Sequence, residues 1–288
     1  MKNLTWQNPE QLFVAQELIN KVKSKCCGIK DYTSERALFD IVQKDGLHFR
    51  ASRYDCMNDS EEYKWLYEPL KVRISEEQGL PKDEVNNLYE KFPYVISFSE
   101  REEEVAMWAK YGGGGNGVCL VLNKELIVAE AELHFKEESD VAMPVRYADE
   151  KTKMEILAEV VEDFRNQGYG TANQQEMFED EVFCSAFVKN KALWEEESEF
   201  RYARIRERGM VARYSVQGGK LSYPEDKCGV QLRPDKPIPY LEIVFPLKVL
   251  DKVIVGPNID AVGLGNIKNK LQNTVCKEID VIPSKVKF

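Results

Sequence analysis

Three short segments of the sequence carry polar, chemically capable side chains at every second position. Successive side chains of a strand point to opposite faces, so residues i and i+2 lie on one face. The polar residues that share a face in this way are His48, Arg50 and Ser52 in segment 47–52, Ser97 and Ser99 in segment 94–99, and Glu197, Glu199 and Arg201 in segment 197–202. The alternate positions are mostly apolar. We therefore predict three strands that each offer one wall of a polar cleft, and we predict that the walls converge.

Carboxylates, hydroxyls and cationic side chains are groups that line catalytic clefts. The same alternation is also typical of a half-solvated antiparallel sheet that carries no site. In that case Glu199 and Arg201 form a surface ion pair worth about 0–1 kcal/mol, and His48 is a structural imidazole. The spacing alone leaves both interpretations open.

Cysteine and histidine are poorly placed for metal binding or for nucleophilic catalysis. The seven cysteines are an odd number, and apart from the adjacent Cys26 and Cys27 they are scattered, without a CxxC pair or a Cys/His cluster. We therefore expect no zinc site, no disulfide framework and no bound metal. Only His48 and His134 could supply an imidazole, so a hydrolase triad has few candidates.

Composition and charge exclude several classes of protein. Of the 288 residues 43% are hydrophobic and 31% are charged, which is typical of a folded globular protein. The formal net charge of -9 opposes general nucleic-acid binding, which depends on basic patches. No apolar run approaches the roughly 20 residues that span a bilayer, and the first ten residues do not resemble a signal peptide. We expect a cytoplasmic protein without a membrane segment.

The patterning predicts an α+β fold, with a mixed or antiparallel sheet flanked by helices. Strands are expected near 47–51, 92–99, 117–122 and 197–205 and helices at 9–23, 33–44, 104–111, 151–166 and 261–271. No linker or internal repeat divides the chain, so one domain over 1–288 is the simplest organisation. It would comprise N-terminal helices in 1–46, a core that carries the motifs in 47–259, and a C-terminal helix and tail in 260–288. No strand is followed by a GxGxxG motif, so a dinucleotide fold of Rossmann type is not expected.

Four sequence blocks, in order, resemble the bacterial DUF2971 family, which is named for its unknown function. The blocks are LHFRASRYDCMNDSEEY at 47–63, ISFSEREEEVAMWAKYGGGGNGVCLVL at 96–122, KNKALWEEESEFRYAR at 189–204 and VLDKVIVGPNI at 249–259. The second is the most specific, through Ser97-Phe98-Ser99, Met107-Trp108 and Tyr111. This chain departs from the family pattern at Met57, Ser60 and Lys110, where the family has an aromatic residue, a proline and a histidine.

The order of these blocks is similar to the layout of ADP-ribosyltransferases, which cleave NAD. This resemblance implies an ADP-ribosyltransferase-like fold with NAD as substrate and a small nucleotide or a macromolecule as acceptor. It implies that Glu199 engages the ribose and stabilises the positive charge that develops there, and that Glu197 positions or deprotonates the acceptor. Ser97 would orient the nucleotide. The residues expected to contact it are Arg50 or His48, with Ser99 and Tyr111.

Two other functions stay open at this point. One is a non-catalytic sensor or binding module in bacterial stress or phage defence. The other is a Mg²⁺-dependent nuclease or phosphodiesterase, whose metal ligands would be Asp55, Asp59, Glu62, Glu197 and Glu199. Tyr111 and Trp108 share one face of the predicted helix 104–111, a spacing more typical of core packing than of a base-stacking platform.

Overall fold

A computed structural model gives the fold of the chain. It describes residues 28–57, 60–78, 91–101, 103–138, 140–166, 185–207, 215–217, 220–222, 228–232, 237–275 and 278–287. The expected helix at 9–23 and the motif residues Asn58 and Asp59 lie outside these ranges.

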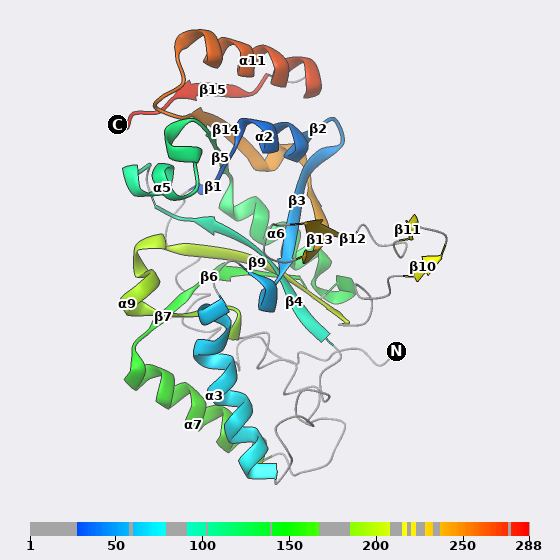
Figure 1. The fold of residues 1–288 in the computed structure, drawn as a ribbon, viewed down its shortest axis with the longest axis vertical. Helices are drawn as coiled ribbons and strands as arrows, with labels where there is room; N and C mark the ends of the chain where they lie inside the picture. The colour runs from blue at the N-terminus through cyan, green and yellow to red at the C-terminus, as the bar shows by residue number, and fades with distance from the viewer. Residues whose placement is uncertain are drawn as a thin grey trace.

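Strands and helices alternate irregularly along the described residues (Figure 1). The strands are β1 Ile29–Thr33, β2 Val42–Gln43, β3 Gly46–Arg53, β4 Lys91–Ser99, β5 Val118–Leu122, β6 Asp140–Pro144, β7 Arg146–Ala148, β8 Val188–Asn190, β9 Glu199–Glu207, β10 Ser215–Gln217, β11 Lys220–Ser222, β12 Cys228–Leu232, β13 Pro237–Phe245, β14 Leu250–Val255 and β15 Asp280–Pro283. The α-helices are α2 Glu35–Ile41, α3 Ser60–Gln78, α5 Val105–Lys110, α6 Lys124–Glu138, α7 Glu150–Asn166, α9 Lys191–Trp194 and α11 Ala261–Val275. The 3₁₀ turns are η2 Tyr54–Cys56, η3 Gly113–Gly115, η4 Glu195–Glu197 and η5 Leu247–Val249.

The largest sheet branches at β4. Its main path runs β12-β13-β3-β4-β1-β5-β14-β15 and is antiparallel except between β14 and β15, while β9 pairs with the other edge of β4 and with β6. The β4·β9 ladder extends over the whole of β4, from Lys91 to Ser99. On the opposite edge, β3 pairs with β4 only at Tyr94 and Val95, and β1 pairs only at Ser99. β3 and β1 therefore leave β4 in different directions, and β3 runs upward from it in Figure 1.

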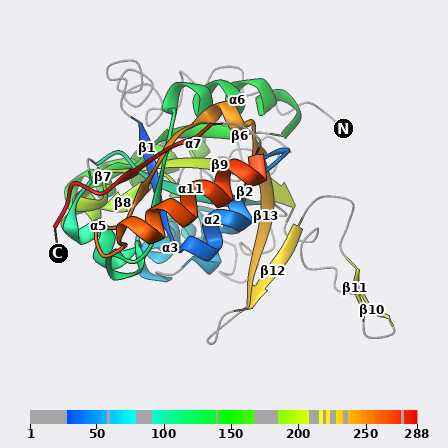
Figure 2. The same ribbon diagram turned by 90° about the horizontal axis from the view of Figure 1, so that it is seen from above.

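Side-chain alternation along β4 and β9 separates an apolar face from a face that carries charge. Phe98 on β4 and Phe200 and Tyr202 on β9 enter the main core, which also receives side chains from α2, α6 and α11. Figure 2 shows α11 close to α2 and β2. The opposite face of the same two strands carries Ser97, Ser99, Glu199 and Arg201, because these odd-numbered residues point the other way.

The α+β class with a mixed, mainly antiparallel sheet is confirmed. The helix expected at 33–44 is present as the shorter α2, which ends at Ile41 where strand β2 begins. Ser34 caps it by accepting a hydrogen bond from the Ala37 backbone amide. No helix in the described ranges has both the length and the apolar composition that crossing a bilayer requires.

Two expectations about local structure are wrong. The segment 1–46 does not consist of helices alone, because Ile29–Thr33 is a strand that pairs with β4 and β5. Five residues with only two large apolar side chains carry too weak a pattern to reveal it. Glu197 is not in the strand that follows it, because it ends the turn η4 and Ser198 then adopts a left-handed conformation with φ of 44°.

Candidate functional site

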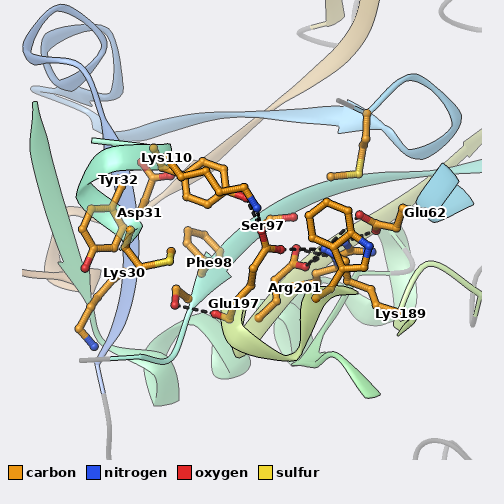
Figure 3. A pocket seen from close by; sticks show the side chains of 16 residues that line it. Lys30, Asp31, Tyr32, Glu62, Ser97, Phe98, Lys110, Lys189, Glu197 and Arg201 are labelled. Atoms are coloured by element: carbon orange, nitrogen blue, oxygen red, sulfur yellow. Dashed lines mark hydrogen bonds and ion pairs between the residues drawn. The ribbon is translucent and has the colours of Figure 1, made fainter. Parts of the chain in front are cut away.

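A cavity of about 500 Å³ lies where the sheet branches. Its lining comes from β1, β4, α5 and its C-terminal end, α3, β8, and the stretch from α9 to β9. Figure 3 shows Glu62, Lys189 and Arg201 together at one end and β1, with Lys30, Asp31 and Tyr32, at the other. Segments distant in the sequence thus supply one pocket.

A lysine lies at the centre of the charged end. The Lys189 ammonium is within 2.9 Å of Glu197 Oε2, 2.9 Å of Glu199 Oε2 and 3.1 Å of Glu62 Oε2. Its side chain is only 3% exposed. Burial would lower the pKa of Lys189, but the carboxylates, led by Glu199 and Glu62, outweigh burial and raise the pKa above its ordinary value. Lys189 is therefore a buried, permanently charged ammonium.

Arg201 completes the network from β9. Its Nε donates to Glu199 Oε1 at 2.7 Å and its Nη2 to Glu199 Oε2 at 3.0 Å, so the guanidinium grips this carboxylate with two donors. Further hydrogen bonds run from Nη2 to Glu62 and from Nη1 to the carbonyl of Ala186. The side chain is fully buried. We call Glu62, Lys189, Glu197, Glu199 and Arg201 the ion cluster.

Glu199 is held ionised inside the protein. Burial alone would raise its pKa, but the charges of Arg201 and Lys189 act more strongly and lower the pKa from 4.5 to about 2. Both carboxylate oxygens already accept hydrogen bonds from these two cations. Glu199 is therefore the anchor of the ion cluster.

Glu197 occupies a more open position than Glu199. Its carboxylate accepts hydrogen bonds from Lys110 and Tyr111 through Oε1 and from Lys189 through Oε2. Burial would raise its pKa, yet the nearby Lys189 charge and these hydrogen bonds lower it overall. The left-handed Ser198 lies between Glu197 and β9, a conformation that costs a non-glycine residue about 1 kcal/mol. Although Glu197 is outside the strand, its carboxylate reaches the ion cluster.

An aromatic side chain packs against the cations of the site. Trp194, the last residue of α9, has Lys189 Nζ 4.5 Å and Lys110 Nζ 4.6 Å from its ring centroid. Both distances suit cation–π attraction. The cavity therefore presents an indole ring beside charged groups.

The two aromatic residues expected on one helical face have separate roles. Trp108 is fully buried and meets Tyr32 edge-to-face at 5.1 Å, so the expectation of core packing is confirmed for it. Tyr111, just after α5, is 38% exposed and donates a hydrogen bond to Glu197. Trp108 lies inside α5 and packs in the core, whereas Tyr111 follows the end of the helix and lines the cavity.

The serines of β4 lie directly beside the charged residues of β9. Ser99 is opposite Glu199 in the ladder and Ser97 is opposite Arg201. Ser99 Oγ donates to the Glu197 carbonyl at 2.8 Å and accepts from the Arg101 amide at 3.2 Å. Ser97 Oγ is buried and has no hydrogen-bond partner of normal geometry in the described part of the chain. With Tyr111, Glu197 and Glu199, five of the seven residues predicted for the site line one cavity.

Arg50 and His48 do not line this cavity, so one of the three expected walls is missing. His48 Nδ1 is 3.0 Å from Glu242 Oε1 and its Nε2 is 2.9 Å from Asp45 Oδ1, whereas the Arg50 guanidinium lies 5.1 Å from the Tyr240 ring centroid. The cause is the branch in the sheet: β3 pairs with β13 from Leu47 to Ser52 after leaving β4.

The cavity also contains four residues that the sequence patterns do not predict for the site: Lys189, Trp194, Lys110 and Asp31. Lys189 and Trp194 belong to the third family-like block, and Lys110 is one of the departures from the family pattern. The one local signal for Lys189 is a lone charge that follows the apolar run Ala186-Phe187-Val188. A buried lysine normally requires an ionic partner, and its partners Glu62, Glu197 and Glu199 are recognisable only in three dimensions.

Of the five acidic residues named for a Mg²⁺ site, Asp59 lies outside the described residues and the other four are committed to other contacts. Glu62, Glu197 and Glu199 surround the Lys189 ammonium. Asp55 accepts hydrogen bonds from Arg53 at 2.6 and 3.1 Å. Within the described ranges no group of three or more His, Cys, Asp or Glu side chains is arranged to hold a metal ion. The geometry therefore gives the nuclease hypothesis no support.

Comparison with known proteins gives one match. Residues 107–202 match the model of the family described as "Protein of unknown function (DUF2971)". No curated protein and no solved structure matches the chain significantly, so the ADP-ribosyltransferase-like arrangement stays a prediction. The matched segment runs from α5 through the Lys189 region to Tyr202 on β9 and thus includes most of the ion cluster. The expected family resemblance is confirmed over residues 107–202, where the chain is similar to the DUF2971 family.

Proposed function

We propose that the cavity binds NAD and that the protein cleaves its nicotinamide–ribose bond, transferring the ADP-ribosyl group to a hydroxyl acceptor or to water. The observation that carries this proposal is Glu197, an ionised carboxylate at the accessible end of a cavity large enough for part of a dinucleotide. Lys110, Tyr111 and Lys189 hold its two oxygens in place.

A fixed carboxylate suits this reaction because the ribose gains positive charge as the bond to nicotinamide breaks. Such a charge is stronger in the transition state than in the ground state, so a preorganised anion lowers the barrier. Glycosidases use carboxylates in the same way. In this proposal Glu197 stabilises the ribosyl cation, and Glu199 acts indirectly by holding Lys189, which binds Glu197.

The binding groups in this proposal differ from those expected from the sequence. Trp194 and Tyr111 offer aromatic surface for a base or a nicotinamide ring, and Lys110 offers a positive charge for the phosphates. Lys110 is half-exposed, so it can turn toward a ligand while Tyr111 and Lys189 still hold the two oxygens of Glu197. Lys110 and Trp194 thereby take the nucleotide-holding role first assigned to Arg50 and His48.

The proposal is tested with Glu197→Gln, which keeps the size of the side chain and removes its charge. We expect kcat/KM for nicotinamide release to fall about 100-fold or more, as when a preorganised transition-state contact is removed. Circular dichroism checks the fold of each variant. The matched control is Glu196→Gln, one residue earlier in the same turn and exposed, which should keep wild-type turnover.

Ligand binding is measured separately by the melting temperature with millimolar NAD, with ATP for comparison. A ligand at ten times its Kd stabilises by about 1.4 kcal/mol, which shifts the melting temperature by a few degrees. Equal turnover in Glu197→Gln and wild type would overturn the role of Glu197. Failure of wild type to bind NAD or to release nicotinamide would overturn the proposed activity.

A second candidate is a non-catalytic binding module that recognises a nucleotide-like ligand. The observation that favours it is that each carboxylate of the ion cluster already has a cationic partner. Carboxylates paired in this way suit a structural role. This candidate predicts a melting shift with a nucleotide and no nicotinamide release. The two measurements above therefore separate the candidates.

A further inference from the structure

Asp31 differs from the acidic residues of the ion cluster in the same cavity. It lies on β1 and lines the cavity, and its carboxyl has neither an ion pair nor a hydrogen bond within the described residues. Glu62, Glu197 and Glu199 all contact Lys189. Asp31 is half-buried in the cavity wall, where a molecule bound in the cavity would lie beside it.

The neighbours of Asp31 do not neutralise it. On β1, Lys30 Nζ donates to the Gly28 carbonyl at 3.2 Å. On β5 the residue opposite Asp31 is the apolar Leu120, and the adjacent Cys119 has a raised pKa, chiefly because it is buried, and is a neutral thiol. From α5 and its end, Lys110 and Tyr111 both point to Glu197. Ser99 of β4, which pairs with the adjacent Lys30, is uncharged.

Burial without a cation has a direct electrostatic consequence. It raises the pKa of Asp31 from 3.8 to about 7, and no charged group contributes to this shift. Glu197 and Glu199 have lowered pKa values in the same cavity. Pairs of carboxyl groups whose pKa values are pushed apart commonly divide acid–base work from charge stabilisation.

We propose that Asp31 is the general base of the pocket and accepts the proton of the acceptor hydroxyl or water during glycosyl transfer. This inference rests on the proposed function. The acceptor oxygen bonds to the ribose C1′ and loses its proton to the Asp31 carboxylate. The bond between C1′ and the nicotinamide nitrogen breaks, and its electron pair leaves with neutral nicotinamide. Glu197 stays ionised throughout, so the two carboxylates have different tasks.

The test is the pH dependence of kcat/KM for nicotinamide release between pH 5 and 9. In wild type we expect the rate to rise with pH and to level off above about pH 7. Asp31→Asn should lower the plateau about 100-fold and abolish the rise, since general-base catalysis contributes 10²–10⁴-fold. The melting shift with NAD should persist. Asp251→Asn, an exposed residue of β14, is the matched control and should leave the profile unchanged.

Each outcome has a distinct meaning. A rise near pH 7 that survives in Asp31→Asn overturns the role of Asp31 and leaves the proposed function intact. Absence of nicotinamide release by wild type at every pH overturns the proposed function and this role together. If Asp31→Asn fails to fold by circular dichroism, Asp31→Glu decides the question. It keeps a carboxyl and should displace the midpoint of the rise, whereas an unchanged midpoint and rate contradict the proposal.

Discussion

Replacing Arg201 with methionine is expected to lower the free energy of unfolding by about 3–5 kcal/mol, the cost of removing one partner of a buried ion pair. The guanidinium is fully buried and contacts Glu62, Glu199 and the Ala186 carbonyl. Without the guanidinium, the nearly inaccessible carboxylates of Glu62 and Glu199 share the single charge of Lys189 with Glu197. Urea unfolding followed by circular dichroism at pH 7 measures the loss.

The control for this substitution is Lys151→Met. Lys151 is 86% exposed and lies 3.7 Å from Glu155, and such surface pairs contribute about 0–1 kcal/mol. Adding Glu62→Gln and Glu199→Gln to Arg201→Met should recover part of the lost stability, because fewer uncompensated charges then stay buried. A loss no larger than that of Lys151→Met would show that the ion cluster does not stabilise the fold.

The second large effect is a decrease in the free energy of unfolding at low pH, caused by protonation of Glu199. Its pKa is about 2 in the folded protein and 4.5 when unperturbed. The stabilisation linked to this difference is fully present above about pH 4.5 and is lost as the pH falls toward 2, because the unfolded chain then binds the proton more readily. A difference of this size corresponds to about 3 kcal/mol. Glu199→Gln should therefore be less stable than wild type at pH 7.

The measurement is the urea midpoint of wild type and Glu199→Gln at several pH values from 7 to 2.5. The two curves should approach each other as the pH falls, because wild type loses the contribution that the variant lacks. Glu155→Gln on the exposed face of α7 is the control and should run parallel to wild type. Curves of wild type and Glu199→Gln that stay parallel would contradict the assignment. The buried contacts of Glu199 thus predict a clear loss of stability for Glu199→Gln.

The alternation of polar and apolar side chains in the sequence predicts much of the site. Polar and apolar residues alternate at 96–99 of β4 and at 199–202 of β9, and this pattern correctly assigns Ser97, Ser99, Glu199 and Arg201 to polar strand faces. Local pairing then brings Ser97 opposite Arg201 and Ser99 opposite Glu199. A period-two pattern identifies a face reliably because burial on one side selects apolar side chains.

The parts of the site that the sequence does not predict depend on contacts between distant segments of the chain. Arg50 lies in a segment where polar and apolar residues alternate as predicted. Only the pairing of β3 with β13 shows that its side chain lies outside the cavity. Lys189 is buried because carboxylates from α3, η4 and β9 meet it, and no local pattern contains that information. Asp31 was missed because β1 is too short and too polar to stand out as a strand.

The branch at β4 also bears on what determines the width of the cavity. One arm of the sheet, β3-β13-β12, joins β4 through two residue pairs, and the other, β1-β5-β14-β15, joins it through the pair of Lys30 with Ser99. The nine-pair β4·β9 ladder is independent of both junctions. The distance of Asp31 and Tyr32 from the ion cluster is therefore set by a single backbone pair and by the side chains that both arms bury in the shared core. Packing, rather than the hydrogen bonds of the sheet, fixes the shape of the cavity at this end.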